Sequence, residues 1–277
     1  MSFKTILVHI DDTKHTQQRI QLAAELALQY QAHLIGVADT GAARFIYQDG
    51  NINGVDPSLL SYLDYLHQRA TQNIADFNLQ VSALGVASHA SEITQDDVAG
   101  GIGHRARYSD LVIVGQTDPE LAMPAVMDNF PEYLVLHSGR PILIIPYAGS
   151  FSHIGKRPMI AWDGSRAATR AITDAIPLLQ QAQLVQLVSV NPKENILVEP
   201  PATSMAAYLE RHGINLEISH HHSTVDIGNA LLSLSADLDA DLIIMGGYGH
   251  SRFRELIMGG ATRTILKCMT VPVFMSH

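Results

Sequence analysis

The amino-acid sequence predicts an α/β protein in which two doubly wound, parallel-sheet domains follow one another along the chain. Short runs rich in Val, Ile and Leu alternate with stretches of helical periodicity, and the second half of the chain repeats the pattern of the first half. The apolar runs are nearly continuous, as expected for parallel strands that helices cover on both faces. Each half is therefore expected to begin and end on a strand, with helices and further strands alternating between them.

The internal repeat is visible in three pairs of matching segments, namely 5–13 with 157–165, 109–115 with 240–246, and 140–145 with 270–275. The third pair is one residue out of step, because setting Pro141 on Pro272 gives an offset of 272 − 141 = 131. In the first pair an apolar strand leads into an aspartate, which is Asp11 in the first half and Asp163 in the second. The offset there is 163 − 11 = 152 residues, whereas it is 246 − 115 = 131 residues between Gly115 and Gly246. The first half therefore carries 152 − 131 = 21 additional residues.

The additional length falls around residues 40 to 65, where we expect a long irregular connection. The residues that interrupt regular structure there are Gly41, Gly50, Gly54 and Pro57. Helical spacing is clear elsewhere, at Ile20, Ala23, Ala24 and Ala27 and at Ala168, Ile172, Ala175, Ile176 and Leu179. A turn-rich linker near 146–150 divides the chain into predicted domains of residues 1–148 and 154–277.

Composition narrows the functional classes. The 277 residues are 47% hydrophobic and 16% charged, which is enough apolar material for two cores. A formal net charge of −9 argues against broad binding to nucleic acid or to anionic membranes. Cys268 is the single cysteine, so an intrachain disulfide is excluded and a buried structural thiol is expected. With no signal peptide and no apolar run near the roughly 20 residues that span a bilayer, we expect a cytoplasmic protein.

Two glycine clusters near the end of the chain are the strongest functional signal. Gly246-Gly247-Tyr248-Gly249 directly follows an apolar run that is typical of a buried strand, and Gly259-Gly260-Ala261-Thr262 opens the next helix. Glycines allow the backbone to approach an anion closely, and the amides at a helix start point toward it with a favourable dipole. The pattern predicts a phosphate-binding loop and favours ligand binding over catalysis.

The spacing G-x2-G-x9-G resembles the nucleotide-binding signature of the universal stress protein family, and both halves look like Rossmann-like domains of that family. The resemblance implies that the second domain binds ATP, with Mg²⁺ if the triphosphate is bound. It implies nucleotide contacts at Asp163, Val190, Met245, Gly246, Gly249, Gly259, Gly260, Ala261 and Thr262. One position departs from the family, because Gly260 stands where Ser or Thr is preferred. The departure removes a hydroxyl donor but keeps the backbone amides, and Thr262 is the candidate to compensate.

The first half has lost this signature. At the same offset its residues are Gly115-Gln116-Thr117-Asp118 and Asp128-Asn129-Phe130-Pro131. Asp118 and Asp128 place negative charge where phosphates would lie, and like charges oppose each other in a partly desolvated site. The first half is therefore not expected to bind ATP in the same manner. It is either structural or serves another ligand through Asp11, Asp12 and the insertion, whose aromatic residues are Phe45, Tyr47, Tyr62 and Tyr65.

Other signals are weaker. Between His250 and Lys267 four cationic side chains stand against Glu255. Arg252 or Arg254 could reach a β- or γ-phosphate, although a solvated loop or helix face is the better explanation for each arginine alone. His220 and His222 follow a strand, but three consecutive histidines rarely complete a metal site. The G-x-x-x-x-G-K-[ST], G-x-S-x-G and H-E-x-x-H motifs are not found, so no catalytic residue is assigned and slow ATP hydrolysis near Glu255 stays open.

The resulting expectation is a stress-response regulatory protein that binds an adenine nucleotide in its second domain. The last strands of the two halves, 142–145 and 273–275, are expected to pair within the chain, because each is an apolar sheet edge that needs cover. A further homodimer and an unidentified protein partner are also expected. Two alternatives stay open: a nucleotide-independent interaction or scaffold protein, and a carrier of another small ligand in the first half.

Overall fold

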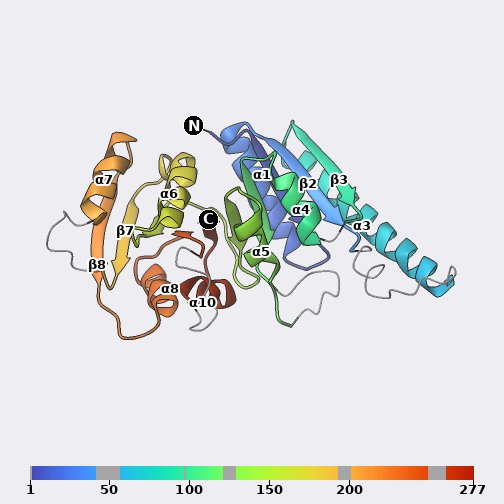
Figure 1. Ribbon diagram of the computed structural model, residues 1–277. Helices are drawn as coiled ribbons and strands as arrows, with labels where there is room; N and C mark the ends of the chain where they lie inside the picture. The colour runs from blue at the N-terminus through green and yellow to red at the C-terminus, as the bar shows by residue number, and fades with distance from the viewer. Residues whose placement is uncertain (1, 42–56, 97, 121–128, 193–200, 249–259) are drawn as a thin grey trace. The chain divides into compact units, whose positions relative to one another are not determined.

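The computed structural model describes residues 2–41, 57–96, 98–120, 129–192, 201–248 and 260–277 (Figure 1). The chain forms two compact units, one from Phe3 to Arg140 and one from Pro141 to His277. Both units are α/β, as the sequence predicts. We refer to β1 through β5 as the first repeat and to β6 through β10 as the second repeat.

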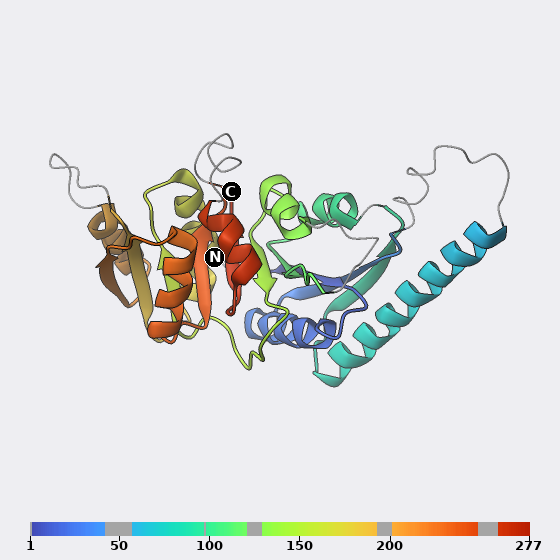
Figure 2. The ribbon, with the colours of Figure 1, turned by 90° about the horizontal axis from the view of Figure 1, so that it is seen from below.

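The first unit contains a parallel sheet with the strand order β3-β2-β1-β4. Helices α1 and α3 cover one face of this sheet and α4 and α5 cover the other (Figure 2). The strands are β1 (Thr5–Ile10), β2 (His33–Asp39), β3 (His89–Thr94) and β4 (Leu111–Gly115). The helices are α1 (Thr16–Tyr30), α3 (Pro57–Ala83), α4 (Val98–Ala106) and α5 (Phe130–His137). The strand residues in the middle of the sheet are buried, which explains why their sequences are almost continuously apolar.

Helix α3 corrects one prediction. The sequence led us to expect an irregular connection as far as residue 65, but a helix of 27 residues begins at Pro57. Proline is favoured at the first helical position, where its missing N–H costs nothing, so Pro57 begins the helix instead of interrupting structure. Figure 2 shows the N-terminal part of α3 extending beyond its sheet. The later part is anchored by one buried stripe of side chains, formed by Leu66, Ala70, Phe77 and Val81.

The second unit contains a sheet with the strand order β5-β10-β9-β6-β7-β8, parallel except at β5. Its strands are β5 (Ile142–Ile145), β6 (Pro158–Ala161), β7 (Val185–Val190), β8 (Leu216–His221), β9 (Leu242–Gly246) and β10 (Val273–Ser276). Its helices are α6 (Arg166–Leu179), α7 (Pro201–Arg211), α8 (Ile227–Asp237) and α10 (Ala261–Cys268). Helices α8 and α10 pack against each other, as α4 and α5 do in the first unit.

The last strands of the two repeats pair with each other, as predicted from their apolar edges. β5 and β10 run antiparallel, with Leu143 opposite Phe274 and Ile144 opposite Val273. All four of these side chains are fully buried. The pairing gives each strand a hydrogen-bonded neighbour that it would lack at a sheet edge, and it explains why β5 groups with the second unit although it ends the first repeat.

Membrane insertion by a helix finds no support in the described part of the chain. None of the helices described there combines the length and the hydropathy required to cross a bilayer. Cys268, expected to be a buried thiol, is instead exposed, because it is the last residue of α10 and lies on the outer face of that helix.

Candidate functional site

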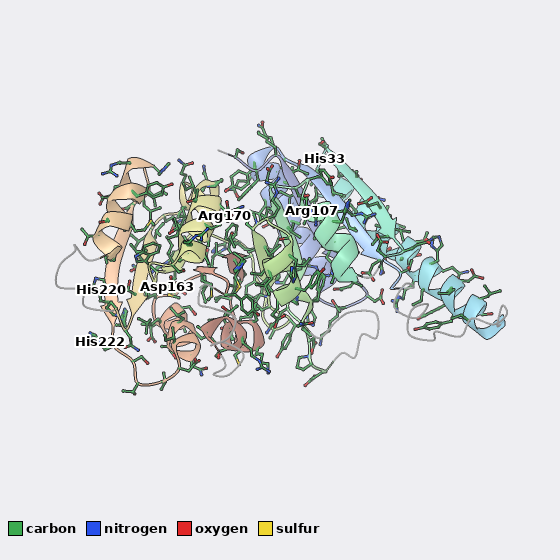
Figure 3. All side chains as sticks on the ribbon, viewed as in Figure 1. His33, Arg107, Asp163, Arg170, His220 and His222 are labelled. Atoms are coloured by element: carbon green, nitrogen blue, oxygen red, sulfur yellow. The ribbon has the colours of Figure 1, made fainter. Side chains whose placement is uncertain are left out.

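The candidate site of the second repeat lies where the strand order of its sheet reverses. β6 pairs with β7 on one side and with β9 on the other, so the chain leaves this point in opposite directions. Ligands of doubly wound sheets bind at such a point, beyond the carboxyl ends of the strands. Asp163 lies just after β6 (Figure 3), and Gly246 is the last residue of β9. The exposed Asp163 accepts a hydrogen bond at Oδ1 from the Ser165 N–H, 2.9 Å away, and so shapes the turn into α6.

Gly246 is required by packing as well as by its place at this edge. A Cβ at Gly246 would lie 2.6 Å from the carbonyl carbon of Ala167 and 2.8 Å from the Ala167 Cβ. Such distances are too short for non-bonded atoms. The absence of a side chain at Gly246 therefore allows the first turn of α6 to approach the end of β9. That turn is fixed by its own cap, because Ser165 Oγ accepts the Ala168 N–H at 3.1 Å.

The start of α10 has no side-chain cap of this kind. Gly260 occupies the N-cap position with φ −62° and ψ 160°, and it carries no side chain that would accept the first-turn amides. By contrast, Ser165 caps α6 and Asp226 caps α8. Helix starts leave several N–H groups without intrahelical acceptors, and these groups attract anions. Helices α1 and α5 likewise begin without a side-chain cap, so the start of α10 is distinguished by its place beside the Gly246–Tyr248 turn.

Thr262 joins the start of α10 to the end of β9. Its side chain is 3% exposed, and Oγ1 accepts a hydrogen bond from the Tyr248 N–H at 3.3 Å. The Thr262 hydroxyl, predicted to compensate for Gly260, therefore contacts the backbone of the first glycine turn and keeps its own proton for donation. The contact brings the two glycine clusters together although 262 − 248 = 14 residues separate the bonded groups.

The remaining sequence-predicted residues fall in three groups. Met245 is buried in β9, and Val190 lies half-buried at the end of β7, one strand away from Asp163. Ala261 begins α10 beside Gly260. Outside the described residues lie Gly249, Gly259, Arg252, Arg254, Glu255, Asp128, Phe45 and Tyr47. The structure thus brings Asp163, Gly246 and the Gly260–Thr262 segment to one edge of one sheet.

His220 and His222, at the end of β8, lie at the far edge of the same sheet (Figure 3). Among the residues that the structure describes, no three His, Cys, Asp or Glu side chains are grouped so that they would hold a metal ion.

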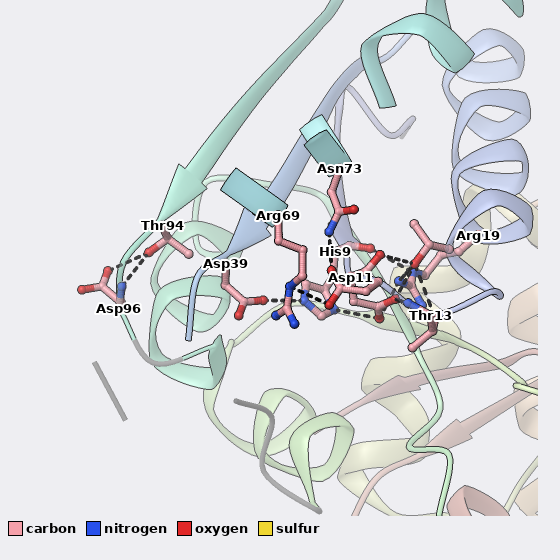
Figure 4. Close-up of polar contacts among 11 residues, drawn as sticks. His9, Asp11, Thr13, Arg19, Asp39, Arg69, Asn73, Thr94 and Asp96 are labelled. Carbon is pink, nitrogen blue, oxygen red and sulfur yellow. Dashed lines mark hydrogen bonds and ion pairs between the residues drawn. The ribbon is translucent and has the colours of Figure 1, made fainter. Parts of the chain in front are cut away.

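The corresponding point of the first repeat is filled by a buried ion pair that sequence reasoning missed. Arg19, on the first turns of α1, is 1% exposed, and one of its terminal nitrogens lies 2.7 Å from Asp11 Oδ2 (Figure 4). The Arg19 Nε also donates to the His9 carbonyl oxygen at 2.8 Å. Burial raises the pKa of Asp11, but Arg19, His9 and the hydroxyls of Thr13 and Thr16 outweigh it and hold the pKa well below its usual range.

This ion pair extends toward both neighbouring strands. The Arg19 guanidinium lies over Gly115, the last residue of β4, where a Cβ would collide with it. On the other side His9 Nε2 lies 2.9 Å from Asp39 Oδ2, at the end of β2. The second repeat has Ala171 at the position of Arg19, since 171 − 152 = 19. One repeat therefore fills its switch point with a side chain and the other leaves a small residue there.

The insertion helix also contributes polar partners to the first repeat. Arg69 of α3 lies 2.7 Å from Asp12 Oδ2, and Asn73 donates to Asp12 Oδ1 at 2.6 Å. An open groove between α1 and α3 is lined by Asp11, Asp12, Lys14, Gln17, Asn73, Asp76, Leu79 and Gln80, among others. His15 lies 3.7 Å from Asp118, which follows β4. Three carboxylates and one lysine lie on this groove, and two of the carboxylates, Asp11 and Asp12, are already paired with arginines.

Three comparisons with known proteins agree with this architecture. The sequence profile of the universal stress protein family matches residues 156–277. A universal stress protein of Synechocystis sp. is 25% identical over 295 aligned positions, covering 98% of this chain and 98% of the relative. The crystal structure of a universal stress protein from Archaeoglobus fulgidus DSM 4304 superposes with a TM-score of 0.76 at 15% identity, covering 98% of this chain and 95% of the other. The last comparison bears on the fold, which extends over both repeats.

Proposed function

Residues 156–277 match the universal stress protein family, and we propose that the chain is a member of it and that its second repeat binds an adenine nucleotide beyond the carboxyl ends of β6 and β9. The observation that carries the proposal is the uncapped start of α10 at Gly260, held beside the Gly246–Tyr248 turn by the Thr262 hydroxyl. Phosphate oxygens are the acceptors that such a helix start accommodates best.

The local charge at this end of the sheet supports an anionic ligand. α10 carries the exposed Arg263 in its first turn and no acidic residue there, whereas Lys267 lies in its last turn, away from this edge. Arg263 stands in a protein of net charge −9, so the positive character is local. On sequence grounds alone we extend the phosphate contacts to Gly249, Gly259 and Arg252, with guanidinium matching phosphate geometry.

The nucleoside part of the ligand would meet the other side of the switch point. Asp163 is exposed just after β6, where its carboxylate accepts hydrogen bonds from a ribose hydroxyl or an adenine amino group. Val190, at the end of the adjacent β7, offers an apolar surface for the base. ATP is the proposed ligand. Mg²⁺ would bind together with ATP, coordinated by its phosphate oxygens and by water, which are ligands that this ion prefers.

The proposed role is regulatory and not catalytic. A nucleotide bound to the α10 amides would bring residues from both glycine clusters into one arrangement, and the surface around them would then differ between the bound and free protein. A partner that recognises one of these surfaces would read the nucleotide state of the cell. The scaffold alternative makes the opposite prediction, namely that the glycines serve packing alone, as Gly246 does against α6.

A substitution at position 260 can separate folding from binding, because it should preserve stability while removing nucleotide affinity. The extended backbone there suits an ordinary N-cap residue, so Gly260→Asp should cap α10 and leave the protein at least as stable as wild type. The new carboxylate would stand where we place phosphate and should abolish binding. Gly260→Ser is the matched control, because it caps the helix without adding charge and should retain or strengthen binding.

The measurement is native mass spectrometry of the full chain with and without Mg-ATP, supported by the fluorescence of Trp162, the single tryptophan, which directly precedes Asp163. We expect one nucleotide per chain for wild type and Gly260→Ser and none for Gly260→Asp. Equal binding by all three proteins would move the site away from α10. No adduct with wild type at millimolar ATP would make the glycine clusters structural and favour the scaffold alternative.

A further inference from the structure

The end of β10 is joined to the first glycine turn by side chains that the proposed nucleotide contacts do not use. His277, which follows β10, lies with Nδ1 2.9 Å from the Gly247 carbonyl oxygen. The Gly247 N–H in turn donates to the Ser276 carbonyl oxygen at 2.8 Å. Because a carbonyl oxygen only accepts, Nδ1 must be the protonated nitrogen of the His277 ring. Gly247 is thereby held at both of its backbone polar groups.

A hydrogen bond to α6 also holds the end of β10. Ser276 is 2% exposed, and its Oγ donates to Asp174 Oδ2 at 2.9 Å. Asp174 also accepts from Arg170 Nε, 3.2 Å away and one turn earlier on the helix. A continuous set of contacts therefore runs from α6 through β10 to the glycine turn. We call the set formed by Asp174, Ser276, His277 and Gly247 the β10 tether.

The β10 tether acts on a turn that needs external support. Tyr248 has φ +54°, in the left-handed region that bulky residues rarely adopt. Such a conformation persists where the surrounding structure determines it. Here Gly247 is bound to β10 on one side, and the Tyr248 N–H is bound to Thr262 of α10 on the other. Hydrogen bonds therefore connect the turn both to β10 and to the helix start that we propose as the phosphate site.

The first repeat lacks the side chains for such a tether. Subtracting the repeat offsets places Leu22 at the position of Asp174, Ile145 at that of Ser276 and Pro146 at that of His277. None of these side chains can make the corresponding hydrogen bonds. Leu22 and Ile145 are buried in the apolar core instead. The tether therefore accompanies the repeat that has the glycine clusters and is replaced by apolar residues in the repeat that has lost them.

We infer that His277 is a positioning residue for phosphate binding: through the β10 tether it fixes the Gly247–Tyr248 turn against the start of α10, without touching the nucleotide itself. This inference rests on the proposed function. Its consequence is selective. Loss of the His277 side chain should lower the affinity for a ligand more, the more phosphates the ligand carries. The affinity for the nucleoside alone should not change.

The nucleotide test compares ATP, AMP and adenosine binding to wild type, His277→Ala and His277→Asn by isothermal titration calorimetry. A neutral hydrogen bond contributes modestly to stability. His277→Ala should therefore lower the affinity for ATP about three- to tenfold and the affinity for adenosine by less than about twofold. His277→Asn should restore ATP binding, because its amide nitrogen takes the place of Nδ1. His220→Ala, a change at the exposed end of β8 in the same sheet, is the matched control and should behave as wild type.

A ligand-free measurement separates this inference from the proposed function. In the free protein, amide hydrogen exchange at Gly247 and Tyr248 should be at least about threefold faster in His277→Ala than in wild type, and normal in His277→Asn. Unchanged exchange would overturn the inference, as would equal losses of ATP and adenosine affinity. If wild type binds no nucleotide at all, the proposed function fails and the phosphate part of the inference fails with it. Accelerated exchange would in that case still establish the tether.

Discussion

Replacement of Arg19 by methionine tests the buried ion pair that distinguishes the first repeat. Methionine keeps an unbranched apolar stem of similar length but removes the guanidinium. Asp11 then loses the group 2.7 Å from its Oδ2, and the His9 carbonyl oxygen loses the donor at 2.8 Å. The side chains of Arg19 and Asp11 are 2% and 10% exposed, so water cannot replace the lost partner fully.

The expected cost follows from this burial. Removing one partner of a buried pair leaves an uncompensated charge and typically costs about 3–5 kcal/mol. With a urea m-value of about 1–3 kcal/mol/M, the unfolding midpoint of Arg19→Met should fall by roughly 1–3 M. The double variant Arg19→Met/Asp11→Leu, which removes both charges, should recover most of that loss. Arg105→Met is the control, because Arg105 pairs with Glu92 at a partly exposed position and should lose at most about 1 kcal/mol.

The pH dependence of the same measurement has a definite sign. In wild type the lowered pKa of Asp11 contributes stability above its unfolded value of about 3.9, and that stability is lost as the pH falls through the lower folded pKa. Without Arg19, burial raises the pKa of Asp11, so the variant protonates this group at a higher pH. The difference between the two proteins, followed by far-UV circular dichroism in urea, should therefore be largest at pH 7 and smaller at pH 4. A midpoint shift no larger than that of Arg105→Met, or one that is equal at both pH values, would refute the assignment.

Two further pairs of substitutions, each with its own control, test the packing and capping of the helices. Gly228→Ala should lower the free energy of unfolding by about 1–3 kcal/mol, because its Cβ would lie 2.6 Å from Thr264 Cβ and 2.9 Å from the Ala261 carbonyl oxygen. Gly103→Ala, whose Cβ would meet nothing closer than 3.7 Å, should be neutral or stabilising by up to about 1 kcal/mol, and a calorimetric scan of both variants compares them. Ser165→Ala should cost about 1 kcal/mol through loss of the α6 cap, whereas Ser165→Asp should not, as measured by urea unfolding with Trp162 fluorescence. An equal loss in both Ser165 variants would argue against the cap.

The fold was predictable because the sequence repeats itself. Near-continuous apolar runs indicated parallel strands, and the doubled order of elements indicated two doubly wound sheets; both predictions are confirmed. The pairing of β5 with β10 was predictable from the apolar edge that each strand would otherwise expose, whereas its antiparallel direction comes from the structure. The error lay at Pro57, which was interpreted as a break. A proline marks the end of one structure and the start of a helix equally well, and the stripe through Leu66 and Phe77 was needed to decide.

The candidate site was predictable in part. Residues that follow parallel strands meet at one edge of a sheet, and this rule correctly brings Asp163 and Gly246 together. The rule does not reach side chains on helices. Arg19 lies eight positions after Asp11, and its contact depends on how α1 folds back over β1 and β4. The resemblance makes Thr262 the candidate to replace the missing hydroxyl, and that role stays a prediction; the structure adds that its Oγ1 accepts the Tyr248 N–H. Hydrogen-bond direction at that scale is set by tertiary packing, which spacing does not encode.

The two repeats use the aspartate after their first strand in opposite ways. In the first repeat Asp11 is surrounded by Arg19, Thr13 and Thr16, so its charge is already satisfied within the protein. In the second repeat Asp163 is exposed, and Ala171 stands where the buried arginine would be. Asp163 is exposed, and the Ser165 N–H that it accepts is a single neutral donor, so Asp163→Ala should lower the free energy of unfolding by no more than about 1 kcal/mol. A loss of nucleotide affinity in that variant would therefore report on the ligand and not on the fold, and the same substitution at Asp11 would report on the fold alone.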